Sequence, residues 1–286
     1  MSETADIIII GGGVMGASIA YHLAKQGDGQ VMLLERQALC NGTTGHSGAI
    51  VRQHYSSDFT IRMARDCLAV FQHFDERVGG DCGFVTTGMI VMVNEQGAEA
   101  LRANVKIQQE QGVDTQLIQP EEVNEAAPGY SSASVALACY EPGTGVADPM
   151  ATTHCFAKRA RDFGATIFEG VTVTQILIAN ERIVGVRTDA GDFQAPIVVL
   201  AANVWSVALA QSIGISLPIT ATRHPMVALR RPNDFGGRSE LHTVGLDLTR
   251  DIYLRPDAGG MTLIGSTENV FSPSNPDDYA QSPQPS

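Results

Sequence analysis

The stretch that decides the fold is DIIIIGGGVMGASIAYHLAKQG at residues 6–27, followed by VMLLE at residues 31–35. Residues 6–10 include an apolar run that ends at three glycines, the pattern of a strand buried on both faces of a parallel sheet. Residues 14–26 then carry apolar side chains at helical spacing and stop at Gly27. Strand, helix and strand within about thirty residues indicate a βαβ unit.

The turn of this unit carries the spacing G-x-G-x-x-G, and Glu35 stands 19 residues after Gly16. Gly11 permits the tight turn, Gly13 lets backbone N–H groups approach a pyrophosphate, and Gly16 lets helix and strand pack closely. The helix N-terminus supplies a positive end, and Glu35 would accept hydrogen bonds from a ribose diol. A glycine-rich turn without a ligand is the alternative, but the combined context favours a dinucleotide site.

Composition excludes several classes of partner. The chain has 286 residues and a net charge of −12, which repels a nucleic-acid backbone. Five scattered cysteines without ligand spacing favour a reducing compartment and argue against a structural metal. No apolar stretch approaches the length of a membrane span, and the N-terminus lacks a signal peptide, so a cytoplasmic protein is expected.

The rest of the chain predicts an α/β protein, α+β overall. Helices are expected at residues 61–78, at residues 98–111 and from Asp148 to about residue 163, where Asp-Pro forms a good helix start. Strands are expected at residues 84–93, 171–178, 183–187, 197–202, 219–229, 241–246, 252–254 and 261–264. The last four indicate a second, mainly antiparallel layer.

This pattern predicts two interleaved domains. Residues 1–80 and 143–216 would form a Rossmann-type dinucleotide-binding domain, and residues 81–142 and 217–270 a substrate domain. Residues 271–286 are rich in Pro, Ser, Asn, Asp and Gln and predict a flexible tail.

Several segments resemble amine-oxidising flavoproteins of the D-amino-acid oxidase, glycine oxidase and sarcosine oxidase (β subunit) type. CNGTTGHSGAIVRQHYS at residues 40–56 resembles the loop and helix that follow the second strand in these proteins. GVADPM at residues 145–150, VVLAANVWS at residues 198–206 and IYLRPDAGG at residues 252–260 also match. The resemblance extends to about Thr267 and implies FAD as the cofactor, which the first βαβ unit alone cannot distinguish from NAD.

The resemblance assigns residues to the cofactor. Thr43, Thr44 and Ser47 would line the pyrophosphate and flavin side, and Val173, or its neighbour Val171, would contact the adenine. Both valines could instead be core residues, and Trp205 could pack against any apolar surface. The full set expected to bind FAD is Gly11, Gly13, Val14, Met15, Gly16, Glu35, Arg36, Thr43, Thr44, His46, Ser47, Val173, Ala201, Ala202 and Trp205.

Three residues are expected to act near the flavin ring. Some relatives tether FAD covalently through a histidine near the position of His46, others bind it without a bond, and noncovalent FAD is the prediction here. Arg52 matches an arginine near the flavin and the substrate carboxylate, although it could be a surface or salt-bridged residue. Tyr253, with Arg255, matches pocket positions, although strand tyrosines are often simply packed.

The implied function is FAD-dependent oxidation of the carbon–nitrogen bond of a small amine or amino acid, such as sarcosine, glycine or a D-amino acid. Hydride would pass to flavin N5, and water would hydrolyse the imine. Alternatives are the flavin subunit of a hetero-oligomeric sarcosine-type dehydrogenase and a catalytically silent FAD-binding protein, so homo- or hetero-oligomers are both possible. Relatives continue into a segment that returns to the flavin, and its absence here predicts a truncated form.

Overall fold

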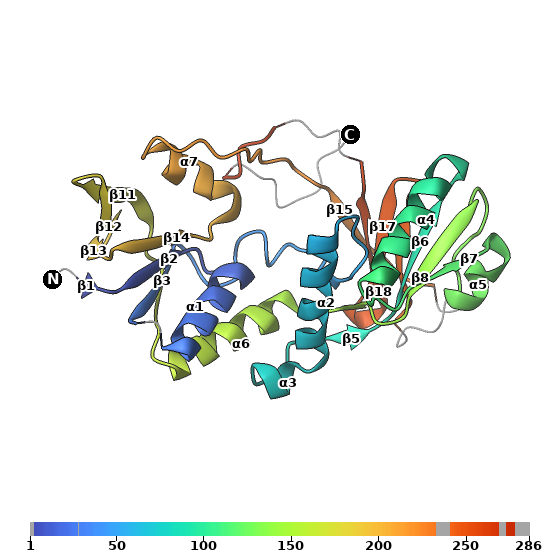
Figure 1. The fold of residues 1–286 in the computed structure, drawn as a ribbon, viewed down its shortest axis with the longest axis horizontal. Coiled ribbons are helices and arrows are strands. Elements are labelled where there is room, and N and C mark those ends of the chain that lie inside the picture. Colours follow the sequence, from blue (N-terminus) through green and yellow to red (C-terminus); the bar gives the residue numbers. More distant parts are fainter. Residues whose placement is uncertain (1–2, 28, 233–240, 269–272, 278–286) are drawn as a thin grey trace.

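The computed structural model describes residues 3–27, 29–232, 241–268 and 273–277. A parallel sheet lies at one end of the molecule and a larger, mainly antiparallel sheet at the other, with helices α2 and α3 between them (Figure 1). The predicted α/β class with a second, mainly antiparallel layer is therefore confirmed. Within the described ranges, no helix combines the length and apolarity needed to cross a bilayer.

The parallel sheet has four strands in the order β10-β3-β2-β14. They are β2 (Ile7–Ile10), β3 (Val31–Glu35), β10 (Thr166–Glu169) and β14 (Ile197–Leu200), and every neighbouring pair is parallel. The four isoleucines of β2 are all buried because the sheet is covered on both faces. Its central strands are those that the first βαβ unit predicts.

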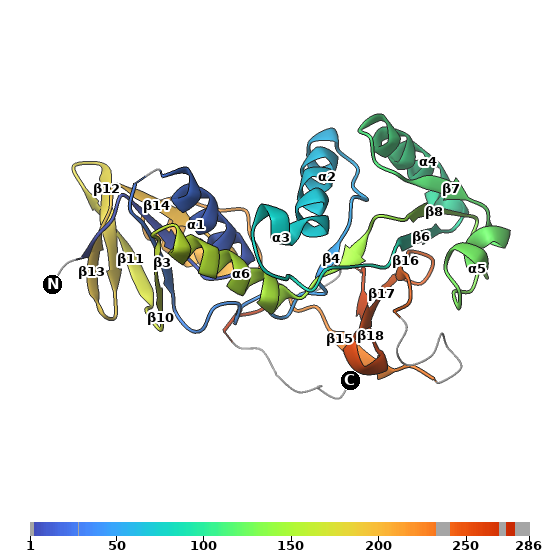
Figure 2. The ribbon, with the colours of Figure 1, turned by 90° about the horizontal axis from the view of Figure 1, so that it is seen from below.

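Alternate residues of β2 point into two separate cores. Ile7 and Ile9 pack with α1 (Val14–Gln26) and α6 (Pro149–Asp162), which lie side by side on one face (Figure 2). Ile8 and Ile10 face a small sheet in the order β1-β13-β12-β11. That sheet consists of β1 (Glu3–Thr4), β11 (Val173–Ala179), β12 (Arg182–Thr188) and β13 (Gly191–Gln194). Together these elements form a three-layer unit.

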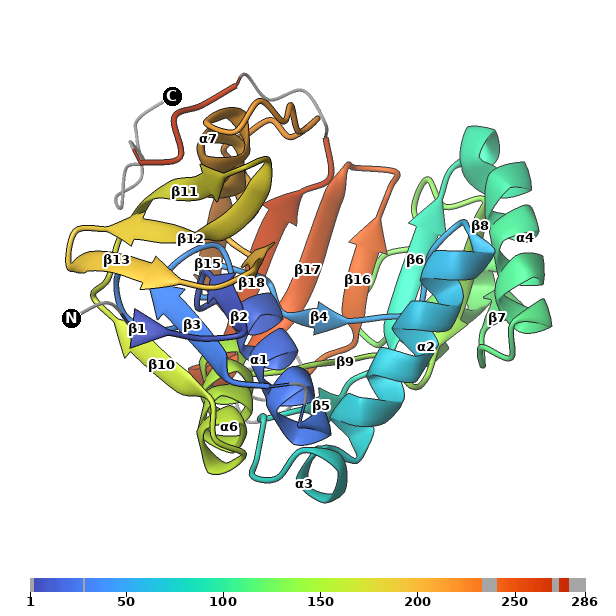
Figure 3. The same ribbon diagram turned by 60° about the vertical axis from the view of Figure 1, so that its left-hand side comes forward.

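The larger sheet has seven strands in the order β15-β18-β17-β16-β6-β8-β7. All neighbours are antiparallel except β16 and β6, which Figure 3 shows side by side although they are far apart in sequence. The strands are β6 (Met89–Val93), β7 (Gln116–Ile118), β8 (Leu137–Glu141), β15 (Met226–Arg230), β16 (Val244–Asp247), β17 (Ile252–Asp257) and β18 (Met261–Ser266). Helix α4 (Glu95–Glu110) packs on one face of β6 and β8.

A three-stranded sheet, β4-β9-β5, joins the two halves (Figure 3). It consists of β4 (Ile50–Val51), β5 (Val85–Thr86) and β9 (Gly145–Val146). The remaining elements are short: α5 (Val123–Ala126), α7 (Ser206–Gln211) and the 3-10 turns η1 (Pro120–Glu122), η2 (Asn203–Trp205) and η3 (Ala258–Gly260). Because β4 belongs to the joining sheet, the segment that follows β4 runs from the half with the parallel sheet towards the half with the seven-stranded sheet.

The helix predicted over residues 61–78 is two helices, α2 (Asp58–Gln72) and α3 (Phe74–Arg77). The chain breaks at His73, whose φ of −123° and ψ of 40° lie outside the helical region. This break lets Phe74 pack in the core beneath α1 and α6. The apolar spacing could not reveal it, because both helices keep the same periodicity.

Two predicted strands are also shorter or interrupted. The strand over residues 84–93 is divided into β5 and β6 at Gly88, which has a φ of 68° that favours glycine. The strand over residues 219–229 is reduced to β15, an edge strand whose side chains are all exposed. Of the predicted tail, residues 271–272 and 278–286 lie outside the described residues. Within residues 273–277, the Ser274 N–H donates to the Ala221 carbonyl at 2.9 Å.

Candidate functional site

The turn between β2 and α1 is shaped by its glycines. Gly11 has a φ of +110°, and a Cβ there would lie 2.7 Å from the Ala201 carbonyl oxygen. A Cβ on Gly16 would overlap the carbonyl oxygen of Gly11 itself, so helix and turn touch through backbone alone. On Gly13, a Cβ would lie 2.8 Å from Thr44 Oγ1. The turn is therefore a bare backbone cradle at the positive end of a helix.

Glu35 reaches this turn from the end of the neighbouring strand. The register pairs Ile10 with Leu34, which brings the carboxyl ends of β2 and β3 to the same edge of the sheet. Glu35 Oε2 accepts a hydrogen bond from the Gly12 N–H at 2.6 Å, and Oε1 accepts from the Gln37 N–H at 2.9 Å. The carboxylate is thus held beside the glycine turn.

The loop after β3 is fixed over the start of α1. Thr44 Oγ1 accepts a hydrogen bond from the Val14 N–H at 3.2 Å, one of the first-turn donors that a helix leaves unpaired. Asn203 Nδ2 donates to Thr43 Oγ1 at 2.9 Å, which ties the same loop to the end of β14. His46 Nδ1 lies 2.9 Å from the Gly42 carbonyl oxygen, and its side chain is exposed. Hydroxyl and backbone groups of this loop therefore surround the turn.

A cavity of about 330 Å³ opens where these pieces meet. The glycine turn lines it on one side, and residues 171–174, at and just before the start of β11, line another. The lining residues are Ile10, Gly11, Gly13, Met15, Leu34, Glu35, Arg36, Gln37, Asn41, Gly42, Thr43, Thr44, Val171, Thr172, Val173, Thr174, Ala201, Ala202, Asn203, Trp205, Ala208 and Leu209. We call this space the first cavity.

One wall of the first cavity is a stacked pair. The guanidinium of Arg36 lies 4.4 Å from the centre of the Trp205 ring. Asp277 accepts hydrogen bonds from Arg36 Nη1 at 2.9 Å and from Trp205 Nε1 at 2.8 Å. These hydrogen bonds, that from Trp205 first, hold the pKa of the Asp277 carboxyl below its ordinary value.

A second cavity of about 320 Å³ lies against the seven-stranded sheet. It is lined by Ser47, Gly48, Ala49, Ile50, Arg52, Met89, Val244, Gly245, Leu246, Tyr253 and Thr267. Burial raises the pKa of the Tyr253 hydroxyl, and the positive charge of Arg255 opposes this rise. Arg255 lines neither cavity and instead pairs with Asp257 at 3.0 Å.

The expected cofactor residues divide between these spaces. Eleven of them line the first cavity: Gly11, Gly13, Met15, Glu35, Arg36, Thr43, Thr44, Val173, Ala201, Ala202 and Trp205. Val14 and Gly16 shape the turn behind it. Ser47 lines the second cavity together with Arg52 and Tyr253, and His46 lines neither.

Sequence reasoning missed Asn203, which lines the first cavity and holds Thr43. Its signal was available: an asparagine directly after two alanines at the end of an apolar strand is suited to the positive φ of 49° that it adopts. It also missed Thr172 and Thr174, which line the same cavity, because the sequence pattern around them indicates only a strand of a half-buried sheet. No group of three or more His, Cys, Asp or Glu side chains in the described ranges is arranged to hold a metal.

These features are those expected of a dinucleotide-binding fold and site. The glycine cradle that a Cβ would fill, the carboxylate at the neighbouring strand and a cavity leading away from both fit an adenine dinucleotide.

Comparison with known proteins extends this result. The family model described as FAD dependent oxidoreductase matches residues 6–285, and the chain belongs to that family. It is 28% identical to human mitochondrial sarcosine dehydrogenase over 94% of this chain and 30% of that protein. It is 31% identical to the sarcosine oxidase subunit beta of an Arthrobacter species, over 79% of this chain and 57% of that protein.

A solved structure shares the whole arrangement. L-proline dehydrogenase from P. horikoshii superposes with a TM-score of 0.84 at 29% identity, over 93% of this chain and 70% of that one. The chain spans only about 30% of the length of the human sarcosine dehydrogenase that it matches.

Proposed function

We propose that this chain binds FAD across both cavities and oxidises the carbon–nitrogen bond of a small amine or amino acid. The observation that carries the proposal is that one loop lines both cavities. Thr44 lines the first cavity, and Ser47, three residues later, lines the second. A ligand held by the glycine turn at one end would thus meet Arg52 and Tyr253 at the other.

The chain's own groups would hold the cofactor without a large positive charge. The N–H groups of the turn and the Thr43 and Thr44 hydroxyls would bind the diphosphate, and Glu35 would bind the ribose. Trp205 and Val173 would flank the nucleotide end. The bound flavin would supply the capacity to accept a hydride, which no side chain in the described part of the chain provides.

Arg52 and Tyr253 would position the substrate. An arginine offers two parallel N–H donors to a carboxylate, so Arg52 suits an amino acid or an N-methylated amino acid better than a simple amine. Tyr253 would donate its hydroxyl proton in a hydrogen bond, since a tyrosine is protonated near neutral pH and burial raises its pKa further. Human sarcosine dehydrogenase and P. horikoshii L-proline dehydrogenase are named for substrates of this class.

The test is the absorption spectrum of the purified chain, followed by anaerobic addition of sarcosine, glycine, proline and D-amino acids. We expect a flavin spectrum that bleaches with at least one of them, and flavin that is released on denaturation, since we propose noncovalent binding with His46 nearby. Gly13→Val should abolish flavin binding, whereas Arg52→Gln should retain flavin and slow its reduction. A flavin that no member of this panel reduces would refute the catalytic proposal.

We further propose that the chain has two interleaved domains, residues 1–80 with 143–216 and residues 81–142 with 217–270. In support, every strand of the parallel sheet comes from the first pair of ranges and every strand of the seven-stranded sheet from the second. Hydrogen exchange would test this proposal, because the backbone amides of the two domains should lose their protection in two separate steps.

For its setting, we propose the cytoplasm and a homo- or hetero-oligomer. Five free cysteines support a reducing compartment, and the likeness to a sarcosine oxidase subunit beta supports a partner chain. Cell fractionation and the mass of the native particle test these two points.

A further inference from the structure

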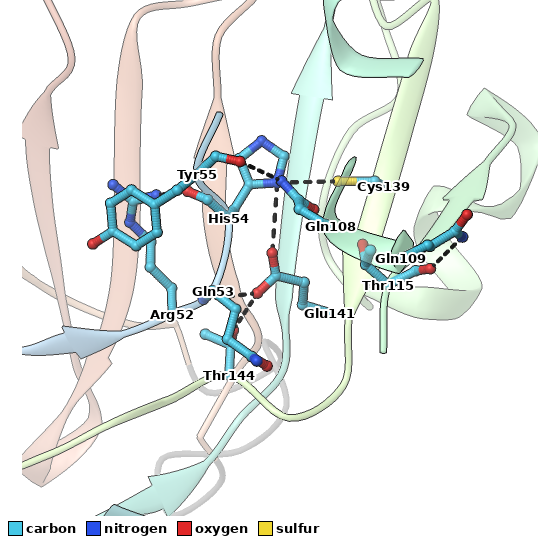
Figure 4. A network of polar contacts seen from close by, with 10 residues as sticks. All are labelled: Arg52, Gln53, His54, Tyr55, Gln108, Gln109, Thr115, Cys139, Glu141 and Thr144. Atoms are coloured by element: carbon cyan, nitrogen blue, oxygen red, sulfur yellow. Dashed lines mark hydrogen bonds and ion pairs between the residues drawn. The ribbon is translucent and has the colours of Figure 1, made fainter. Parts of the chain in front are cut away.

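A buried polar cluster lies where the chain leaves β4, next to Arg52 (Figure 4), which lines the second cavity. Gln108 of α4 is fully buried, and Glu141 of β8 is 1% exposed. Gln108 Oε1, Glu141 Oε1 and Thr115 Oγ1 are buried atoms without a hydrogen-bond partner in the described part of the chain. Because buried polar groups without partners destabilise a fold, such a cluster calls for an explanation.

Gln108 and Glu141 each make a hydrogen bond to the backbone of one short segment, residues 53–55. Gln108 Nε2 donates to the Tyr55 carbonyl oxygen at 3.0 Å. Glu141 Oε2 accepts from the Gln53 N–H at 3.1 Å and from Thr144 Oγ1 at 2.8 Å. Residues 53 and 55 are thus fixed by two side chains that lie 88 and 53 positions further along the chain.

His54 lies between these two anchors. Its Nδ1 is 3.1 Å from Gln108 Nε2, 3.5 Å from Glu141 Oε1 and 3.7 Å from Cys139 Sγ. A catalytic triad needs both ring nitrogens, one for the nucleophile and one for the acid, whereas here a single nitrogen faces all three groups. Burial, with the charge of Glu141, also raises the pKa of the Cys139 thiol to about 12. The cluster is therefore not a second catalytic centre.

Arg52 connects this segment to the second cavity. Its guanidinium donates a hydrogen bond to the carbonyl oxygen of His54 and lies 4.3 Å from the centre of the Tyr55 ring. Both contacts are made with the segment that Gln108 and Glu141 hold. The place of the guanidinium in the cavity therefore depends on those two buried side chains.

We propose that Gln108 and Glu141 are positioning residues for Arg52, so that they determine how tightly the second cavity binds a carboxylate. This inference rests on the proposed function, in which Arg52 receives the substrate carboxylate. It explains why a glutamine of α4 and a glutamate of β8 are buried where this helix packs on the sheet mainly through apolar side chains. It also identifies residues that touch neither cavity and yet control the chemistry of one.

The test measures acetate binding to the full chain with its flavin, by calorimetry and by perturbation of the flavin spectrum. Arg52→Gln should weaken acetate binding about tenfold, the usual effect of losing a hydrogen bond to a charged group. Gln108→Leu and Glu141→Leu should weaken it by about three- to tenfold, since they leave the charge in place but release its support. Glu141→Gln should restore most of the affinity, because an amide oxygen still accepts from Gln53 and Thr144.

Gln109→Leu is the matched control. Gln109 is the next residue of the same helix and its Nε2 also donates to a backbone carbonyl, that of Thr115 at 2.8 Å. Within the part of the chain that the structure describes, it makes no hydrogen bond with residues 52–55. We expect its affinity for acetate to equal that of the parent. The double variant Arg52→Gln with Gln108→Leu should bind acetate no more weakly than Arg52→Gln alone.

A second readout needs no flavin. The Nε–H resonance of Arg52 should shift or broaden in Gln108→Leu and stay in place in Gln109→Leu. If Arg52→Gln leaves acetate binding unchanged, the proposed role of Arg52 fails and this inference fails with it. If Arg52→Gln weakens acetate binding but Gln108→Leu and Glu141→Leu do not, only the positioning role is overturned. The same holds if the double variant loses affinity by the product of the two single-variant factors.

Discussion

The two cavities are built in opposite ways. The first is built around the backbone of one short glycine turn, which lies against the Ala201 carbonyl just after β14, and its walls come from within residues 34–44, 171–174 and 201–209. The second is formed mainly by side chains, which come from residues within 47–52 and 244–246 and from residues 89, 253 and 267. A wall made of local backbone tolerates no added atom, whereas a wall made of side chains can adjust.

Substituting Gly16 should therefore produce the largest effect. A Cβ at this position overlaps the Gly11 carbonyl, and neither backbone can move without separating β2 from α1. We expect Gly16→Ala to cost roughly 3 kcal/mol or more in the free energy of unfolding, the upper range for overpacking, and to abolish flavin binding. Urea unfolding checks this, with Ser18→Ala on the same helix as the control; equal stability of the two variants would contradict it.

Removing the Glu35 carboxylate should have the next largest effect. Its two oxygens accept the N–H groups of Gly12 in the turn and of Gln37 after β3, so Glu35→Ala leaves these two donors without their partner. We expect a loss of about 1–2 kcal/mol in stability and weaker flavin binding. Glu35→Gln should lie between the alanine variant and the parent, and an alanine variant with unchanged flavin affinity would show that the carboxylate does not serve the ligand.

Gly265→Ala tests the same feature beside the second cavity, against Tyr253 of its lining. A Cβ there overlaps the ring of Tyr253, a half-buried side chain that can turn away. We expect a loss of only about 1 kcal/mol, less than at Gly16. Combining it with Tyr253→Ala should remove the clash, so the two changes should cost less together than the sum of each alone. A cost equal to that of Gly16→Ala would remove the distinction between the two cavities.

The smallest expected effect concerns acid. Burial, together with the charge of Arg231, lowers the pKa of His242, which contacts Thr262 near the seven-stranded sheet, below its ordinary value. The unfolded chain then binds a proton at higher pH than the folded one, so stability present above about pH 6.5 is lost as the pH falls. The difference in the free energy of unfolding between pH 7 and pH 5 should be smaller in His242→Gln than in the parent protein. His22→Gln on the exposed face of α1 should change it less.

Much of the first cavity could be predicted. Gly11, Glu35 and Thr44 lie around one space because each belongs to a motif in which sequence spacing fixes geometry. Ser47 and His46 show the limit of this prediction. The loop that holds them was expected to contact one side of a single ligand, yet Ser47 lines the second cavity and His46 lines neither. A loop's side-chain directions depend on contacts, here Asn203 with Thr43, that no spacing records.

The sequence by itself determined the βαβ unit, its glycine turn and the acid that meets it, because strand, helix and turn preferences act over a few residues. Only the tertiary structure decided the second cavity. Met89 and Val244 line it as neighbours because β6 and β16 pair in parallel, 155 residues apart, in a register fixed by packing rather than by any local pattern. Gln108 and Glu141 reach the segment beside Arg52 for the same reason: the folded sheet and its helix bring them there.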